Sequence, residues 1–369
     1  MVQLLRLSES RKLLTACGQV VSTMRDFDLD AAKAKLAAVS REAVLSSTLS
    51  TVDYLEHYDE RIEIMKERER MVQEEESGQA GIKTGIPRFD RFTGGLMPKE
   101  WGIILGVTGV GKTAGLIEFG ANAYDFQGKN VFIGSGEMGV DELAFRVDSR
   151  FTRIHGMKFR TAGLDESDYK QWGNTIRQYR ATHDNVLCIA SYPRRFTVED
   201  FDRDMRRMEE ETGKRFDLVC LDYINILDPV KRGRSDAKDQ SEAVWDFKGL
   251  CAERGISGWT AGQVIDDAYD KELYDASDAK YARAISEAAP VIIALIQTDK
   301  DLIAGQMKLQ VIKMRNADVP RKPIRLEPNL GIMRLHEEVR KKSASLADLK
   351  PTSIDVKRTS RKPKPKRGK

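Results

Sequence analysis

The stretch GVTGVGKT, residues 106–113, decides the fold, because it matches the phosphate-binding pattern G-x-x-x-x-G-K-T. It follows the apolar run WGIIL and precedes the helix-like segment AGLIEFGANAY. A strand before the pattern and a helix after it form the context that the pattern requires. Gly106, Gly109 and Gly111 allow the loop to curl so that its backbone N–H groups face phosphates. The sequence therefore predicts a nucleotide site.

Two side chains of this stretch have an expected chemical role. Lys112 would reach the β- and γ-phosphates of ATP, and the Thr113 hydroxyl would ligate Mg²⁺. Thr108 and Val110 complete the loop whose backbone would bind the phosphates. The apolar run FDLVCLD ends in Asp222, an acidic strand end suited to the Mg²⁺ shell. ATP and Mg²⁺ are therefore the expected cofactors.

Hydrolysis also requires a group that orients or deprotonates water, and Tyr223 stands where a Glu could have followed Asp222. A candidate base is Glu137, at the end of the run VFIGSGEM. Ligands of open α/β sheets bind at the carboxyl ends of the strands, which would place Glu137 near the γ-phosphate. From the residues alone, the alternative that Glu137 caps the next helix remains open.

The composition is that of a globular protein: 369 residues, 41% hydrophobic and 32% charged. The apolar stretch Val291–Ile296 is far short of the roughly 20 residues that cross a bilayer, and the first residues become charged too early for a secretory signal. Four cysteines lie far apart, without the spacing of a zinc site or a disulfide framework. We therefore expect a cytoplasmic protein without a membrane partner.

From about residue 82, short apolar runs alternate with amphipathic segments, a pattern typical of an α/β fold with a mainly parallel sheet flanked by helices. The expected strands are Trp101–Leu105, Val131–Ile133, Val186–Ile189, Leu218–Leu221, Trp259–Thr260 and Val291–Ile296. An antiparallel extension is expected from Leu309–Ile312, Ile324–Leu326 and Ile332–Arg334.

The flanks of this α/β domain, expected over residues 82–338, differ from it in composition. Residues 1–50 are expected to form a short helical segment, and 51–81 a linker helix and hinge. The narrow apolar stripe of 51–76 favours docking on a partner, with a solvated helix held by ion pairs as the alternative. Residues 339–369 form a basic tail, expected to be a disordered arm that contacts nucleic-acid phosphates or only aids solubility.

Together, the segments from about 83 to 336 resemble the RecA-type motor domain of DnaB-type replicative helicases, the hexameric ring helicases of bacteria and their phages. The likeness is carried, in order, by TGIPRFDRFTGGLMPKEWGIILG (84–106), GEMGVDELAFR (136–146), LVCLDYINIL (218–227), TAGQV (260–264) and IKMRNADVP (312–320). The resemblance implies a RecA-like P-loop fold in 82–338. It also implies an ATP-dependent, ring-forming helicase that moves 5′ to 3′ on single-stranded DNA and unwinds a replication fork.

The resemblance also implies roles for individual residues. Glu137 corresponds to the catalytic base and Gln263 to the sensor of the γ-phosphate. Lys313 and Arg315 correspond to groups that reach into the neighbouring subunit's site, with Arg315 as the arginine finger. A guanidinium supplied in trans stabilises the charge on the γ-phosphate in the transition state, so hydrolysis would depend on assembly into a homo-oligomer.

Two loops are expected to contact DNA, 228–240 after the Asp222 strand and 276–287, which aligns with the family's DNA-contacting loop. Basic side chains there would hold phosphates without distinguishing bases, although a charged loop is often only solvated. The expected contacts are Lys231, Arg232 and Arg234 in the first loop, and Lys280 and Arg283 in the second.

The chain also departs from the family pattern. The phosphate loop lacks the family's usual Pro, and Ile265 and Asp266 replace the Asn-Arg that usually follows the sensor Gln. These departures indicate a divergent, phage-type member in a bacterial or phage-infected cytoplasm. Most of the family's N-terminal collar has no counterpart here, which predicts a shortened N-terminal domain. A helicase loader or a primase is a further partner that the resemblance implies. Two alternatives remain open: a RecA-like recombination or repair ATPase, and a nucleotide-dependent assembly module that does not unwind DNA.

Overall fold

The computed structural model of the chain describes residues 53–56, 58–74, 81–193, 196–229, 236–268, 271–280, 282–315, 319–320 and 322–338. The expected N-terminal segment, the basic tail, and Lys231, Arg232 and Arg234 of the first expected DNA loop lie outside these residues. The chain divides after Glu337 into two units, and everything described below belongs to the first, apart from Glu338.

A nine-stranded sheet carries the fold, in the order β3-β2-β4-β5-β1-β6-β7-β8-β9. Strands β1 to β6 are parallel to one another, and β7 to β9 continue the sheet from β6 in antiparallel pairs, as expected. The strands are β1 (Trp101–Gly106), β2 (Val131–Ser135), β3 (Leu187–Ser191), β4 (Leu218–Asp222), β5 (Ser257–Gln263), β6 (Val291–Ile296), β7 (Met307–Met314), β8 (Ile324–Asn329) and β9 (Arg334–Glu337).

One predicted strand is displaced. The run Ile332–Arg334 was expected to be a strand, but Ile332 ends a short 3₁₀ helix, η4 (Leu330–Ile332), and β9 begins at Arg334. Met333 between them has a positive φ of 51°, in the left-handed region, which an extended strand does not contain. The turn at η4 brings Leu330 and Met333 toward the sheet edge where the phosphate loop lies.

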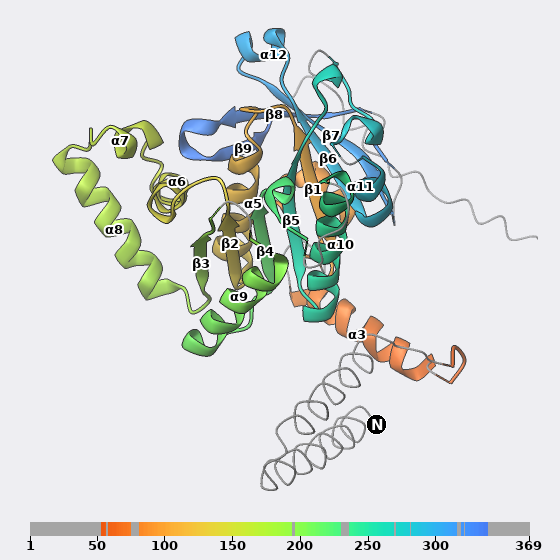
Figure 1. Cartoon of the computed structure of the whole chain (residues 1–369). Coiled ribbons are helices and arrows are strands. Elements are labelled where there is room, and N and C mark those ends of the chain that lie inside the picture. The colour runs from red at the N-terminus through yellow and green to blue at the C-terminus, as the bar shows by residue number, and fades with distance from the viewer. Residues whose placement is uncertain are drawn as a thin grey trace, which may run out of the picture. The chain divides into compact units, whose positions relative to one another are not determined.

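Helices cover both faces of the sheet (Figure 1). On one face α9, α10 and α11 pack through residues such as Phe201, Phe247 and Ile285. On the other, α4, α5 and α6 pack through residues such as Phe89, Leu116 and Leu143. The α-helices are α3 (Tyr58–Glu74), α4 (Pro87–Thr93), α5 (Lys112–Gln127), α6 (Val140–Thr152), α7 (Gly156–Arg160), α8 (Glu166–Thr182), α9 (Val198–Thr212), α10 (Asp236–Arg254), α11 (Ala282–Ala288) and α12 (Asp299–Ile303).

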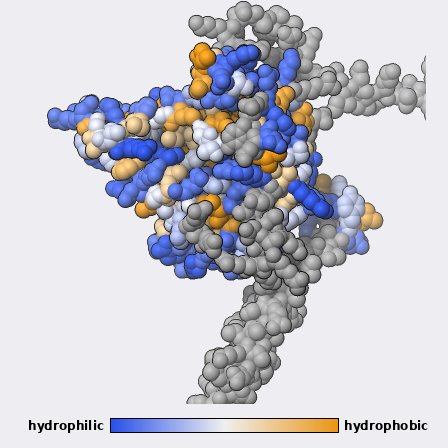
Figure 2. Space-filling model, turned by 45° about the horizontal axis from the view of Figure 1, so that its top comes forward, coloured by the Kyte–Doolittle hydropathy of each residue, from blue (hydrophilic) through white to orange (hydrophobic). Residues whose placement is uncertain are grey.

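The central strands are buried on both faces, which explains their nearly continuous apolar sequences. In β1, Ile103 and Leu105 join the core under α9 to α11, whereas Ile104 joins the core under α4 to α6. This alternation follows from the two-residue period of a strand. Figure 2 shows that the visible face is mainly hydrophilic, with apolar residues in small groups. Among the described helices, none is long and apolar enough to cross a membrane.

Helix α3 lies within the expected linker, and several of its apolar side chains are exposed. Leu55, just before the helix, is 76% exposed, Tyr58 is 58% exposed and Met65 is 49% exposed. The helix contains the exposed ion pair Lys66–Glu63 at 2.7 Å, spaced i,i+3 where the solvated-helix alternative expected i,i+4 pairs. The docking of its apolar stripe on a partner remains a prediction.

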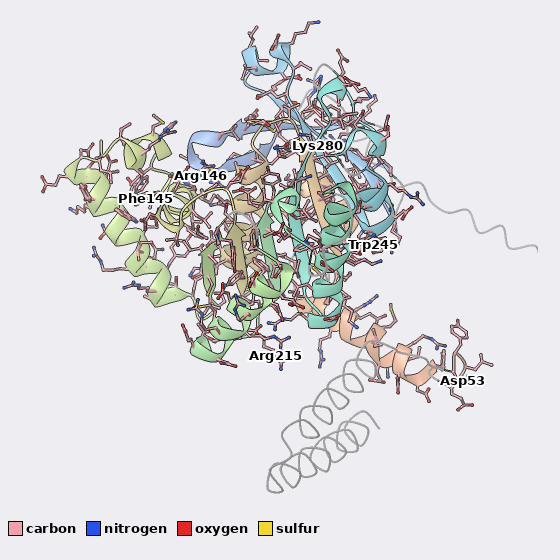
Figure 3. All side chains as sticks on the ribbon, in the orientation of Figure 1. Asp53, Phe145, Arg146, Arg215, Trp245 and Lys280 are labelled. Atoms are coloured by element: carbon pink, nitrogen blue, oxygen red, sulfur yellow. The ribbon has the colours of Figure 1, made fainter. Side chains whose placement is uncertain are left out.

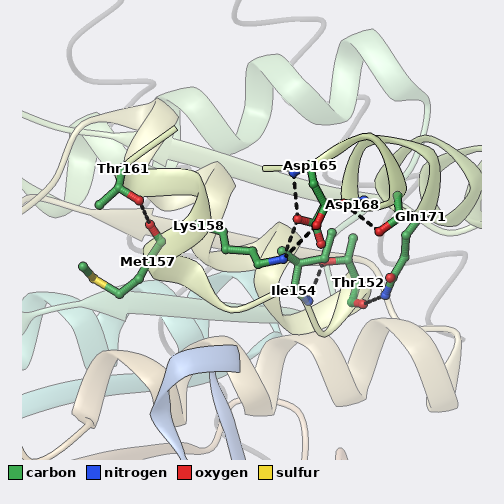
Figure 4. A network of polar contacts seen from close by, with 9 residues as sticks. Thr152, Ile154, Met157, Lys158, Thr161, Asp165, Asp168 and Gln171 are labelled. Atoms are coloured by element: carbon green, nitrogen blue, oxygen red, sulfur yellow. Dashed lines mark hydrogen bonds and ion pairs between the residues drawn. The ribbon is translucent and has the colours of Figure 1, made fainter. Parts of the chain in front are cut away.

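The turn between α6 and α8 is fixed by a polar network around α7 (Figure 4). Asp165 and Asp168 form a capping box at the start of α8, and Lys158 of α7 donates to Asp168 at 2.6 Å. Gln171 of α8 donates to the carbonyl oxygen of Thr152, at the end of α6, at 2.6 Å. These bonds hold the three helices together and fix the position of α7 beside η4.

A buried ion pair joins the helix after the phosphate loop to α6. Arg150 of α6 and Glu118 of α5 are 4% and 3% exposed, and the guanidinium Nε donates to the Glu118 carboxylate. Arg150 also donates to the side-chain oxygen of Asn122 at 2.7 Å. Breaking a buried pair leaves one uncompensated charge without water, which is much more costly than breaking an exposed pair.

We therefore expect Arg150→Met to lower the free energy of unfolding by about 3–5 kcal/mol. Arg203→Met, which breaks the pair of the 71% exposed Arg203 with Asp200, is the matched control and should cost less than about 1 kcal/mol. Urea unfolding followed by circular dichroism measures both. Equal effects of the two variants would show that the Arg150–Glu118 pair does not hold α6 on α5.

Candidate nucleotide site

The loop between β1 and α5 has the geometry that its glycines predict. Gly109 and Gly111 have φ values of 84° and 104°, in the left-handed region that favours glycine. A Cβ on Gly106 would lie 2.6 Å from Cγ1 of Val110 and 2.9 Å from the carbonyl oxygen of Leu295. The loop is therefore compact, with Val110 buried behind it at 4% exposure.

Lys112, the first residue of α5, folds back over this loop. Its Nζ donates to the carbonyl oxygens of Gly106 at 3.1 Å and Val107 at 2.9 Å. Burial lowers the pKa of the Lys112 ammonium, and the negative charges of Asp222 and Glu137 oppose that shift. Among the described residues, the hydrogen-bond partners of this partly desolvated cation are carbonyl oxygens, so it would gain strongly from an anionic ligand such as a phosphate.

Thr113 and Asp222 meet beside this lysine. The Thr113 hydroxyl donates to the Asp222 carboxylate at 2.9 Å, and Asp222, the last residue of β4, is 3% exposed. Burial raises the pKa of Asp222 to about 6, against the Thr113 hydrogen bond and the Lys112 charge, which lower it. A hydroxyl and a carboxylate side by side are oxygen ligands of the kind that Mg²⁺ prefers, so the residues present fit this ion.

Glu137 lies next to Asp222 because their strands are paired. Ser135 of β2 is in register with Asp222 of β4, and the Gly136 N–H donates to the Asp222 carbonyl oxygen at 2.9 Å. The next side chain, Glu137, is exposed and lines the same cavity as Lys112. The pairing of two strands thus places both carboxylates at one sheet edge.

A cavity of about 270 Å³ contains most of the site predicted from the sequence. The predicted residues that line it are Thr108, Gly109, Gly111, Lys112, Thr113, Glu137, Asp222 and Gln263. Among the described residues, no cluster of three or more His, Cys, Asp or Glu could hold a metal ion by itself.

The same cavity also has a wall that the sequence analysis missed. Arg146 of α6, which pairs with Glu142 at 2.9 Å, and Leu330 and Met333 around η4 line it. These three residues also line an adjacent cavity of about 490 Å³, with Phe145 among its apolar residues. Arg146 lies within the quoted segment GEMGVDELAFR, but nothing in the sequence places Leu330 beside Gly111, more than 200 residues earlier.

Lys280, expected in the second DNA loop, does not line the cavity around Lys112 but is hydrogen-bonded to Gln263, which does. Its Nζ donates to the side-chain oxygen of Gln263 at 2.9 Å, and its backbone N–H donates to the Gln263 carbonyl oxygen at 2.9 Å. The positive charge of Lys280 also contributes to lowering the Lys112 pKa. Figure 3 shows Lys280 and Arg146 toward the upper end of the sheet. Arg283 was expected in the same loop, but it lies in helix α11, where its side chain is 92% exposed and pairs with Glu287 at 3.0 Å.

Lys313 and Arg315, the expected trans-acting residues, do not line the cavity around Lys112. The Lys313 Nζ donates to the carbonyl oxygens of Ser286 at 2.5 Å and Ala289 at 2.9 Å. Arg315 is exposed just after the end of β7. The two cations therefore lie apart from the phosphate loop of their own chain.

A glycine loop between a strand and a helix, beside an acidic strand end in a mainly parallel sheet, defines a P-loop fold of the RecA-like class. The family described as DnaB-like helicase C terminal domain matches residues 81–349. The chain belongs to this family, which confirms the resemblance found in its sequence.

Relatives and solved structures agree with this family. Replicative DNA helicase DnaB of Geobacillus stearothermophilus is 24% identical over 278 residues, 74% of this chain and 58% of that protein. Replicative DNA helicase DnaB of Pasteurella multocida is 24% identical over 303 residues, 79% of this chain and 63% of that protein. This chain thus spans less than two thirds of the length of these relatives.

Two solved structures share the fold. The ATPase domain of a phage helicase superimposes with a TM-score of 0.66 at 18% identity, covering 76% of this chain and 98% of that chain. A DnaB-like replicative helicase, solved in a study of its interactions with primase, has a TM-score of 0.68 at 17% identity. It covers 89% of this chain and 76% of that chain.

The elevated Asp222 pKa predicts a stability cost of the ionised carboxylate. Folding raises the pKa of Asp222 from 3.8 to about 6. The stability that the protonated Asp222 carboxyl contributes is therefore full below pH 4 and is lost as the pH rises through 6. We expect Asp222→Asn, which cannot ionise, to be more stable than the unmodified protein at pH 7, by on the order of 2–3 kcal/mol. The difference should shrink toward pH 4.

Thermal and urea unfolding of both proteins at pH 4, 5, 6 and 7 measure this difference. A variant that is less stable than the unmodified protein at pH 7 would contradict the expected stability cost of the ionised Asp222 carboxylate.

Proposed function

We propose that this protein is an ATP-hydrolysing helicase that forms a ring, moves 5′ to 3′ on single-stranded DNA and unwinds duplex at a replication fork. The observation that carries the proposal is the meeting of Lys112, Thr113, Asp222 and Glu137 around one cavity, in a chain of the DnaB-like helicase C-terminal family. We place its activity in the cytoplasm of a bacterium or a phage-infected host.

ATP would bind with its phosphates against the loop from Gly106 to Thr113. The Lys112 ammonium would exchange its two carbonyl partners for β- and γ-phosphate oxygens. Thr113 and Asp222 would hold Mg²⁺, which neutralises phosphate charge when bound. The adenine base of ATP would lie toward the adjacent cavity, where Arg146 and Phe145 offer a cation and an aromatic face.

Glu137 would accept the proton of the attacking water, and Gln263 would contact the γ-phosphate. Both line the cavity around Lys112, which supports these roles. Arg315, exposed and remote from its own phosphate loop, suits an arginine finger that completes the site of a neighbouring copy, and Lys313 belongs to the same trans-acting segment. Hydrolysis would then require assembly, which we propose to be hexameric.

DNA would pass the loops that follow β4 and β5, with Lys231, Arg232, Arg234 and Arg283 as contacts and Lys280 between DNA and nucleotide. The exposed side chains of α3 suit docking on a neighbouring copy. A helicase loader or a primase is a further proposed partner.

The function is tested with a forked duplex that carries a 5′ single-stranded tail. We expect ATP-dependent unwinding by the unmodified protein and none by Lys112→Ala, because the variant lacks the cation that binds the phosphates. Lys170→Ala, on the exposed surface of α8, is the matched control and should unwind normally. Pairing of homologous strands without unwinding would support a recombination ATPase instead, and ATP turnover indifferent to single-stranded DNA would support an assembly module.

Trans-complementation tests the arginine finger. Glu137→Gln and Arg315→Ala should each lower the ATPase rate by at least about 100-fold. The first variant lacks the general base, and the second lacks the arginine finger. Mixing them should restore activity, since an intact Glu137 from one variant can meet an intact Arg315 from the other. A mixture no more active than its components would contradict a finger supplied in trans.

A further inference from the structure

The C-terminal end of α11 is bound by the segment that carries the proposed finger. The last carbonyl groups of a helix lack partners within the helix, and cations bind them favourably. Lys313 supplies such a cation: its Nζ donates to the carbonyl oxygens of Ser286 at 2.5 Å and Ala289 at 2.9 Å. The ammonium therefore binds α11 instead of extending freely from β7.

Arg315 is attached to the same end of the helix. Its backbone N–H donates to the carbonyl oxygen of Pro290 at 2.9 Å, and its guanidinium approaches the carbonyl oxygen of Glu287 at 3.4 Å. The peptide segment that presents the finger thus rests on the residues that end α11 and follow it.

The segment that leads into α11 is bound to the nucleotide site. Lys280, two residues before the helix, holds Gln263 through both a side-chain and a backbone hydrogen bond. Gln263 ends β5 in register with Gly106, the first residue of the phosphate loop. Any displacement of Gln263 by a γ-phosphate would therefore act directly on Lys280.

Between the Lys280–Gln263 contact and the Lys313 contact, α11 is a short helix that is closely packed against the core. Ala284, Ile285 and Ala288 are 5%, 0% and 0% exposed and belong to the core beneath α10 and α11. A helix of 7 residues anchored in this way moves as a unit, because deforming it would break close packing along its length.

We propose that Lys313 is a positioning residue that fixes Arg315 through α11, and that α11 links the finger to the nucleotide site of its own chain through Lys280 and Gln263. This rests on the proposed function of the site. ATP bound in one protomer then changes the position of Arg315, which that protomer supplies to the nucleotide site of its neighbour. Lys313 acts on the neighbouring phosphate only through Arg315.

The experiment measures single-turnover ATP hydrolysis by the full-length protein with single-stranded DNA, in the presence and absence of Arg315. We expect Lys313→Met to lower the single-turnover rate about 10-fold in the protein that keeps Arg315. The ATP concentration that gives half the maximal rate should change less than 2-fold. In the Arg315→Ala background, Lys313→Met should change the rate less than 2-fold, because there is no finger left to position. A second 10-fold loss in that background would show that Lys313 contacts phosphate itself and would overturn the proposal.

Two further variants control for folding and for charge. Lys313→Arg keeps a donor for the α11 carbonyl groups and should stay within 3-fold of the unmodified rate, so a loss equal to that of Lys313→Met overturns the proposal. Lys308→Met removes a cation from the same strand, where Lys308 pairs with Asp301 at 3.1 Å, and should have no effect. An equal loss in both methionine variants would likewise contradict a specific role.

The link to the nucleotide site is tested by a double-mutant cycle between Lys280→Met and Lys313→Met. We expect the double variant to deviate at least 3-fold from the product of the single effects, whereas independent effects would refute the link through α11.

An unmodified protein without ATPase activity would instead refute the proposed function. In that case, hydrogen exchange of the Arg315 segment with and without an ATP analogue decides the link, since a linked segment changes its protection and an unlinked one does not.

Discussion

The nucleotide site depends on two opposite charges, Lys112 and Asp222, kept largely away from water at the carboxyl edge of a parallel sheet. Burial disfavours the charged form of both side chains: it lowers the pKa of the lysine and raises that of the aspartate. Their contacts with carbonyl groups and with Thr113 hold them in place without neutralising them. A triphosphate with a divalent cation would satisfy both, which is why this edge is suited to bind nucleotide.

The rest of the fold serves to maintain that arrangement. Strand β1 delivers the phosphate loop, β4 delivers Asp222, and the pairing of β2 with β4 brings Glu137 beside it. The buried Arg150–Glu118 pair fixes α6 on α5, and α6 carries Arg146 into the same cavity. On the other side, β5 ends at Gln263 and leads through Lys280 to α11 and the Arg315 segment.

Much of this was predictable because the chemistry is local in sequence. The phosphate loop, the Asp222 strand end and the Glu137 strand end are short patterns, and the apolar runs predicted the sheet, with only the last strand displaced by the turn at Met333. The missed features arise from long-range packing. Leu330 beside Gly111, Lys280 on Gln263 and Lys313 on the end of α11 are contacts that no local pattern encodes.

The central claim is that one protomer's phosphate site is completed by a cation from its neighbour. Its most direct test is the ATPase rate per protomer, measured across a dilution series alongside sedimentation velocity, which reports the assembled fraction. The account predicts that activity rises and falls with assembly and is nearly lost in the monomer. A monomer that hydrolyses ATP at the same rate as the assembled protein would contradict it.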